Sequence, residues 1–283
     1  MTRRNALPRK ICDIFICAFS LMATALALAL MGWIIFIIIR EGASSLSWEI
    51  LVNKSCPYGE ANGGIANALI GTVIITLGAA LLAIPLAIAA GIGLAEFGGT
   101  GRFAAVCRFA INLMMGIPSV IAGLFIYGIV VVTTGHFSGF AGSIALAILM
   151  FAVVERTTED QLSLVSVALR ESALALGISR TRVTLQIICR AAKSGMLTGI
   201  LLAVARVSGE TAPLLFTALF ADNWPTNYFG GPTPSVPVLI TNYTLDSPFE
   251  PMQRIGWSAA LVMALVILTV NIAVRYASSR KKQ

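Results

Sequence analysis

Residues 194–219 form an apolar run that contains two opposite charges, Arg206 and Glu210. On a continuous helix, residues four positions apart lie on one face and their side chains can touch. At a rise of about 1.5 Å per residue, Arg206 would lie roughly 16 Å from Gly195, near the middle of a hydrocarbon core about 30 Å thick. Two interpretations are open: a charged element on a translocation path, or a buried ion pair that fixes helix packing. Because a charge at that depth is costly, we favour the path.

The chemistry that suits Arg206 is anion binding. A guanidinium group is planar and permanently charged, and it can hold two oxygens of a phosphate at once. Glu210 would repel a bare anion, but it can serve as a resting partner for Arg206. It can also accept a hydrogen bond from the proton that phosphate, unlike sulfate, keeps at neutral pH. The pair is therefore a candidate site for phosphate selection.

The residues around this pair predict an irregular backbone and a close helix contact. Thr211 and Pro213 follow in the run GETAPLLF. Pro213 leaves the carbonyl of Gly209 without its helical donor, so it marks a cavity wall, a hinge or a tolerated membrane proline. Gly195 and Gly199 make a GxxxG spacing, which allows another helix to approach closely.

Composition indicates that membrane helices hold these residues. Of 283 residues, 57% are hydrophobic and only 12% are charged, with a mean hydropathy of +0.87, as expected for a polytopic membrane protein. The net charge of +7 comes from basic residues clustered in certain loops, which orients the chain and does not indicate nucleic-acid binding. The sequence contains no GxxxxGK[ST], HExxH or GxSxG motif, and its five cysteines have no metal-binding spacing.

The apolar runs predict six membrane spans, and the first is expected to be a retained signal anchor. Pro85 and Pro118 should kink the second and third spans. The fourth run has 14 apolar residues, fewer than the usual ~20, and must tilt or recruit flanking residues to cross. The spans are expected over residues 14–39, 67–94, 106–132, 141–154, 194–219 and 255–274.

The distribution of basic residues predicts that both termini are cytoplasmic. The loop 221–254 is acidic or neutral and would be extracytoplasmic. Residues 155–193 are the longest expected cytoplasmic segment between two spans. They carry an apolar stripe at helical spacing, which Gly177 interrupts. This segment is either a solvated charged helix or a helix–turn–helix on which a soluble partner docks.

Several runs resemble a known family. Glu171-Ser172-Ala173, followed by Gly177 and Ile178, resembles the coupling loop of ATP-binding-cassette importer permeases. Other runs resemble the PstA family of phosphate permeases, and ETAPLLFTA is the most specific of them. The departures are Ser172 in place of a usual Ala, Ala152 in place of a frequent Pro, and Cys189-Arg190 in place of a common Leu-Pro. The similar runs are GGIANALIGTVIIT, GIGLAEF, NLMMGIPSVIAGLFIYG, ERTTEDQLSLV and ARVSGETAPLLFTA.

The resemblance implies an all-α fold, the type I importer permease architecture, with six spans and cytoplasmic coupling helices between the fourth and fifth. It implies a transport subunit of the bacterial inner membrane that binds no cofactor and is not itself an enzyme. The implied partners are a PstC-like second permease, a dimer of ATP-binding subunits that carries ATP and Mg²⁺, and a periplasmic phosphate-binding protein. On the translocation path we expect Arg206, Glu210, Thr211 and Pro213. In contact with the ATPase we expect Arg170, Glu171, Ser172, Ala173 and Gly177.

The sequence therefore predicts a permease subunit of a phosphate importer. Three alternatives stay open: a permease for molybdate or sulfate, a stand-alone channel or structural membrane protein, and an intramembrane enzyme. The last would need a nucleophile or metal set, and the sequence shows no such constellation.

Overall fold

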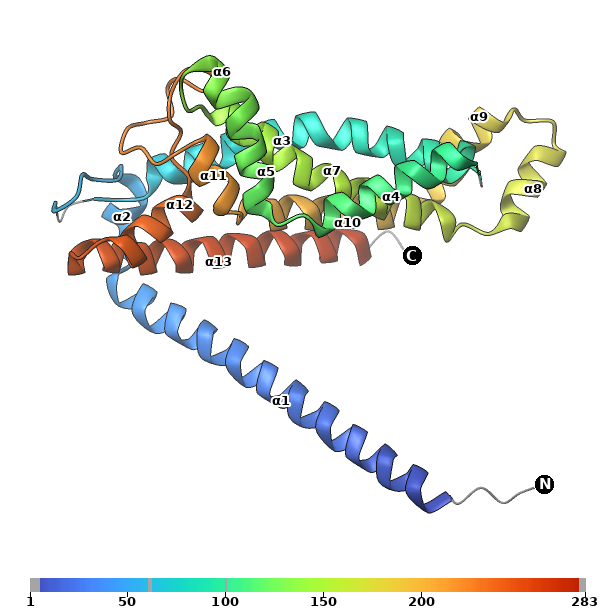
Figure 1. The fold of residues 1–283 in the computed structure, drawn as a ribbon, viewed down its shortest axis with the longest axis horizontal. Coiled ribbons are helices and arrows are strands. Elements are labelled where there is room, and N and C mark those ends of the chain that lie inside the picture. Colours follow the sequence, from blue (N-terminus) through green and yellow to red (C-terminus); the bar gives the residue numbers. More distant parts are fainter. Residues whose placement is uncertain (1–5, 61–62, 100, 280–283) are drawn as a thin grey trace.

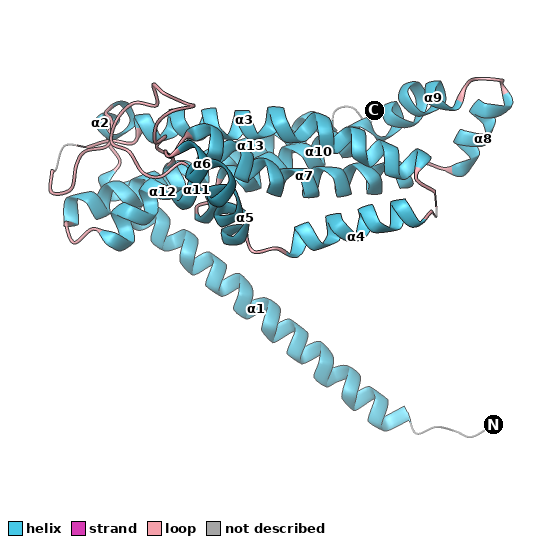
Figure 2. Cartoon of the chain, turned by 45° about the horizontal axis from the view of Figure 1, so that its top comes forward, coloured by secondary structure: helices cyan, strands magenta, loops and turns pink. Residues whose placement is uncertain are grey.

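A computed structural model describes residues 6–60, 63–99 and 101–279, and the regular structure in these ranges is entirely helical (Figures 1 and 2). Several basic residues on which the predicted cytoplasmic termini depend lie outside the described residues: Arg3, Arg4, Arg280, Lys281 and Lys282. The α-helices are α1 Ala6–Ser45, α2 Trp48–Val52, α3 Ala66–Ile92, α4 Arg102–Gly116, α5 Ser119–Ile126, α6 Val132–Thr134, α7 Gly139–Ser163, α8 Val167–Ala175, α9 Arg180–Arg182, α10 Cys189–Ser208, α11 Ala212–Thr217, α12 Val236–Thr241 and α13 Glu250–Ser279. Four π-helical segments adjoin them: η1 Gly93–Phe97, η2 Tyr127–Val131, η3 Val183–Ile188 and η4 Asn242–Asp246.

Within the described ranges, five helices are long and apolar enough to cross a membrane, and a bent pair makes a sixth candidate. This confirms the all-α membrane fold. The bent pair corrects the expected span 106–132: its two parts, Arg102–Gly116 and Ser119–Thr134, are inclined by 102°. The cause is Pro118, which holds Ile117 in an extended conformation (ψ 127°) and stops the helix rather than kinking it.

The fourth and fifth spans also differ from expectation. α7 continues nine residues past the expected end at 154, to Ser163, because its charged last turns form ion pairs. α10 begins earlier, at Cys189, and ends at Ser208, so 194–219 is not one helix. Gly209 caps α10, and Pro213, which cannot continue a helix, lies in the first turn of α11.

The centre of the bundle is the contact between α3 and α7. Ala79, Ala83, Ala87 and Gly91 recur every four residues on α3 and are all buried. A Cβ atom added at Gly91 would lie 2.7 Å from the Cβ of Thr158 on α7. Small residues at this spacing let two membrane helices approach closely.

α10 packs against the same helix. A Cβ atom at Gly195 would collide with Gln161, and one at Gly199 would collide with Thr157; both of these residues belong to α7. The helix that the GxxxG spacing accommodates is therefore α7.

At the end of the bundle that carries α2 and α12, polar side chains join the loop after α2 and the segment 221–254 to the helices. The Asn67 side chain donates to Ser55 Oγ (2.7 Å) and accepts from Ser55 N (2.9 Å). Tyr243 donates to the carbonyl of Cys56 (2.8 Å). Tyr228 donates to Ser143 Oγ (2.7 Å) on α7. The loop 221–254 is thus fixed to the bundle, and it contains α12 and η4.

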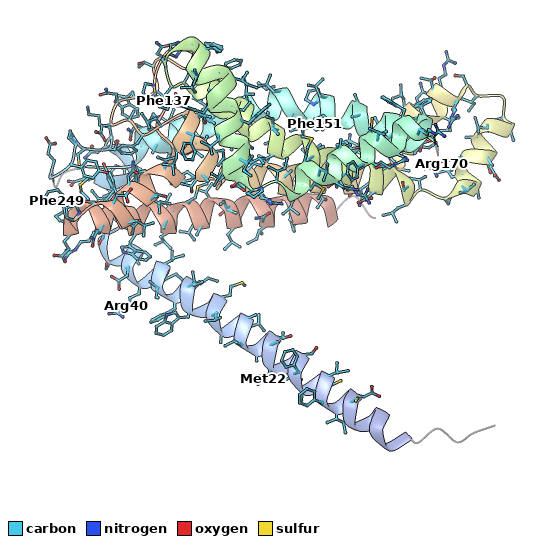
Figure 3. The ribbon with its side chains drawn as sticks, in the orientation of Figure 1. Met22, Arg40, Phe137, Phe151, Arg170 and Phe249 are labelled. Carbon is cyan, nitrogen blue, oxygen red and sulfur yellow. The ribbon has the colours of Figure 1, made fainter. Side chains whose placement is uncertain are left out.

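α1 projects away from the other helices, and its apolar segment is unburied (Figures 1 and 3). Its contact with the bundle is at its C-terminal end, on α13. There Ser258 donates to the carbonyl of Gly42 (3.1 Å). A Cβ atom at Gly42 would lie 2.7 Å from both Leu261 Cβ and the carbonyl of Trp257. One glycine therefore allows this helix to cross α13.

Asp222, in the loop after α11, makes the stability of this region depend on pH. Burial raises the pKa of Asp222, a hydrogen bond from Ser55 and the charge of Lys54 oppose that rise, and Glu60 adds to it. The folded state therefore holds the Asp222 proton to higher pH than the unfolded state, so stability falls as pH rises through the folded-state pKa. We expect Asp222→Asn to raise the unfolding temperature at neutral pH.

The difference in unfolding temperature between Asp222→Asn and wild type should shrink towards about pH 4, where the wild-type carboxyl is also protonated. Thermal unfolding of the detergent-solubilised protein at several pH values measures it. Asp246→Asn, at an exposed position, is the matched control. A stabilisation that is independent of pH would contradict this account.

The glycine at position 123 sets the distance between α5 and α11. A Cβ atom there would lie 2.5 Å from Pro213 Cα, whereas one at Gly128 would meet nothing within 4 Å. Gly123→Ala should therefore cost about 1–3 kcal/mol of stability through overpacking, and Gly128→Ala should cost much less. Thermal unfolding of both variants compares them, and equal unfolding temperatures would show that the contact does not constrain α5.

Candidate functional site

A cavity of about 210 Å³ lies at the break between α4 and α5. Arg206 and Glu210 both line it. The rest of the wall comes from the end of α4, the break itself, the start of α5, and the middle of α7. Its lining residues are Met114, Met115, Ile117, Pro118, Ser119, Leu149, Val153, Arg206, Val207 and Glu210.

The two charged residues reach this cavity from a helix end, not from one helical face. Arg206 lies in the last turn of α10, and Glu210 lies in the short connection to α11. The connection is a tight turn in which Glu210 N donates to the carbonyl of Val207 (3.1 Å) and Gly209 N to that of Arg206 (3.2 Å). The expected arrangement on a continuous helix was wrong, because α10 ends between the two residues. The cavity nevertheless brings them together.

The side chain of Arg206 makes no hydrogen bond or ion pair with another described residue, and Arg206 is exposed. In particular, no ion pair joins it to Glu210 within the described ranges. Its five N–H donors can therefore meet an anion without first leaving a carboxylate. α5 begins at Ser119 on the cavity wall, and the amino end of a helix carries partial positive charge. The cavity thus combines a fixed cation, a carboxylate and apolar side chains.

Thr211 and Pro213 lie beside the cavity and do not line it. The carbonyl of Thr211 accepts from Leu214 N (3.1 Å) and Leu215 N (3.2 Å), which begins α11. Pro213 is buried against Gly123 of α5. These two residues therefore hold the chain after Glu210 against the helix that forms the opposite wall.

The residues expected to couple to a partner are divided between two faces of α8. Ala173 is buried, and Arg170 turns inward, whereas Glu171 and Ser172 are exposed. Gly177 has φ +77°, a conformation that glycine adopts without strain, and it reverses the chain between α8 and α9. We call α8 and α9 the coupling helices. Figure 3 shows Arg170 at their junction with the bundle.

A small apolar core holds the coupling helices onto the bundle. It consists of Leu162 of α7, Ala173 of α8, Val183 and Ile188 of η3, and residues of α10. Ile92 and Ala95, at the end of α3 and in η1, pack against it. The outer surface remains apolar: Leu176 is 80% exposed, which leaves a surface suited to a partner protein.

Ion pairs that sequence reasoning missed join the elements around this core. Arg108 of α4 contacts Glu159 of α7 at 2.6 Å, and Arg170 contacts Glu96 of η1 at 2.8 Å. These partners are 51 and 74 residues apart in the sequence. A usable signal was present at Glu96, which is the lone acidic residue in the otherwise basic stretch 96–108.

Similarity to known proteins agrees with this architecture. Residues 83–283 match the family described as binding-protein-dependent transport system inner membrane component. The chain is 43% identical over 250 residues to the phosphate transport system permease protein PstA of Yersinia pestis, which covers 88% of this chain and 84% of the relative. It is 43% identical over 265 residues to PstA of Haemophilus influenzae, covering 93% and 92% of the two chains.

Solved structures share the fold at low sequence identity. An inward-facing structure of the MetNI methionine ABC transporter has a TM-score of 0.63 at 12% identity and covers 76% of this chain and 95% of its own. An amino acid ABC transporter solved with histidines has a TM-score of 0.56 at 19% identity, with coverage of 75% and 92%. This is the fold of type I importer permeases. The chain therefore belongs to the binding-protein-dependent transport system inner membrane components and, within them, to the PstA permeases.

Proposed function

We propose that this chain is the membrane-spanning permease subunit of an ATP-driven phosphate importer, and that the Arg206–Glu210 cavity is part of its translocation path. The observation that carries the proposal is a guanidinium group, without a partner among the described residues, in a cavity at a membrane-helix break. Such a group is costly unless a ligand or water meets it. The names of the relatives, phosphate transport permeases, support phosphate as that ligand.

Each residue has a distinct role in the proposed path. Arg206 binds two phosphate oxygens through parallel N–H groups. Glu210 accepts the hydrogen bond of the phosphate hydroxyl, which a sulfate ion cannot donate. Thr211 and Pro213 keep this turn against α5, so that the charged pair faces the break at Pro118.

The transport complex is proposed to contain three further components. A PstC-like second permease completes the channel, a periplasmic phosphate-binding protein delivers the substrate, and a dimer of ATP-binding subunits contacts the coupling helices. The exposed side chains of Glu171, Ser172 and Leu176 support that last contact. The chain itself is proposed to bind no cofactor and to have no ATPase site, with ATP and Mg²⁺ held by the partner.

The proposed location is the bacterial inner membrane, with both termini in the cytoplasm. The N-terminal end of α1 and the C-terminal end of α13 point towards the end of the molecule that carries the coupling helices (Figure 1). This common direction supports the orientation expected from the basic loops.

Replacement of Arg206 tests the path. Arg206→Gln should reduce phosphate uptake roughly tenfold or more. Arg206→Lys should retain part of the uptake, because the positive charge remains while the bidentate contact is lost. Uptake is measured in cells that lack other permeases of this type, at matched membrane expression and with ATPase assembly checked. Arg254→Gln, which removes an exposed ion pair with Glu250, is the control. Full uptake in Arg206→Gln would make the residue structural.

Replacement of Glu210 tests selectivity separately. Glu210→Gln removes the charged acceptor, so the preference for phosphate over sulfate should fall by roughly tenfold, the order expected for one hydrogen bond to a charged group. Titration of the purified permease with each anion measures this without the binding protein, which would otherwise select the substrate. A ratio of affinities equal to that of wild type would refute the role of Glu210.

A further inference from the structure

Glu96 lies in η1, directly after α3, and its side chain is almost fully buried. Among the described residues its carboxylate has one charged partner: Arg170 Nη2 of α8 donates to Glu96 Oε1 at 2.8 Å. A buried carboxylate that loses such a partner is strongly destabilised, so the contact fixes the position of the arginine.

Arg170 also donates to the chain that leads into α8. Its Nη2 also donates to the carbonyl of Leu162 (2.6 Å), and its Nη1 donates to that of Val165 (2.9 Å). One guanidinium group thus joins η1, the end of α7 and α8. The planar arrangement of its donors fits several acceptors at once, which a lysine could not reproduce.

The chain beyond the Gly177 turn returns to the same place. Arg180 of α9 donates to the backbone carbonyl of Glu96. Its guanidinium carbon lies 5.3 Å from the centre of the Phe97 ring, within range of a cation–π contact. Both coupling helices are therefore anchored on two adjacent residues of η1.

η1 is connected in turn to the wall of the cavity. Arg108 of α4 donates to the carbonyl of Leu94 in η1 (3.0 Å) and pairs with Glu159 of α7 (2.6 Å). α4 ends at Gly116, next to Met114 and Met115 of the cavity wall. A displacement of η1 can thus reach the cavity through α4, whose last turn lines it, while the adjoining helix α3 carries the same displacement to its contact with α7.

We propose that Glu96 is the positioning residue that transmits movement of the coupling helices to α3 and α4, and so to the Arg206–Glu210 cavity. The proposal rests on the proposed transport function, since it assumes that a partner ATPase moves α8 and α9. Glu96 does not line the Arg206–Glu210 cavity. Its loss should leave ATP hydrolysis in place and separate hydrolysis from transport.

The test uses the complete reconstituted complex with Glu96→Gln, Arg170→Gln and the double variant. We measure phosphate transported per ATP hydrolysed in proteoliposomes, together with assembly of the ATPase subunits. Each single variant should assemble and hydrolyse ATP, with the transport ratio reduced roughly tenfold. The double variant should be no worse than the more impaired single variant, because both remove one contact. Glu250→Gln, which removes an exposed ion pair of 2.7 Å, should keep the wild-type ratio.

A second readout does not depend on the transported substrate. Ser119→Cys, in a protein whose native cysteines are replaced, reports on the cavity through its labelling by a thiol reagent. Addition of ATP should change this labelling in the assembled complex, and Glu96→Gln should abolish the change. If the unmodified complex moves no phosphate, the proposed substrate is wrong, and the labelling still decides the role of Glu96.

Two results would overturn the proposal. One is an ATP-dependent labelling change in Glu96→Gln equal to that of wild type. The other is a double variant whose fold reduction in phosphate transported per ATP equals the product of the two single reductions. If Glu96→Gln fails to assemble, Arg180→Gln provides the second test, because it removes the contact with the Glu96 carbonyl from an exposed position. It should lower both the transport ratio and the ATP-dependent labelling change. Wild-type values in Arg180→Gln would overturn the proposal.

Discussion

The close approach of α3 and α7 is the constraint on which the rest of the structure depends. In a bilayer, apolar side chains gain little by leaving lipid, so helices associate through packing of small residues and through polar contacts. Ala79, Ala83 and Ala87 give α3 a flat surface, and α7 lies on it. α10 then packs on another side of α7 through Gly195 and Gly199. α7 is thereby the common support for the elements that carry the cavity and the coupling helices.

Against this rigid support, two interrupted helices form the candidate site. Irregular backbone is tolerated at membrane depth only where it is buried in protein or lines a cavity. The break at Pro118 and the turn at Gly209 both border the cavity, and the contact between Gly123 and Pro213 holds their following helices together. Helix interruption therefore exposes polar groups at a place where the neighbouring helices are fixed.

Local sequence features predicted much of this arrangement. Apolar length predicted the membrane helices, and the charges of Arg206 and Glu210 predicted a shared site. The interruption between these residues was missed, because Pro213 is as consistent with a kink as with a helix end. Long-range pairs such as Arg108–Glu159 were inaccessible, since neither charge by itself indicates its partner 51 residues away. Only the folded chain brings their helices together.

The position of α1 has a consequence for the order of folding during synthesis. α1 packs on α13, which is synthesised much later, through a hydrogen bond between residues 216 positions apart, Ser258 and Gly42. α1 can enter the bilayer early, since it contains a long apolar segment and satisfies its own backbone hydrogen bonds. It cannot acquire its place on α13 until the ribosome has synthesised α13. A prematurely terminated product would therefore retain an inserted but undocked α1, which distinguishes it from the finished protein for membrane proteases and insertion factors.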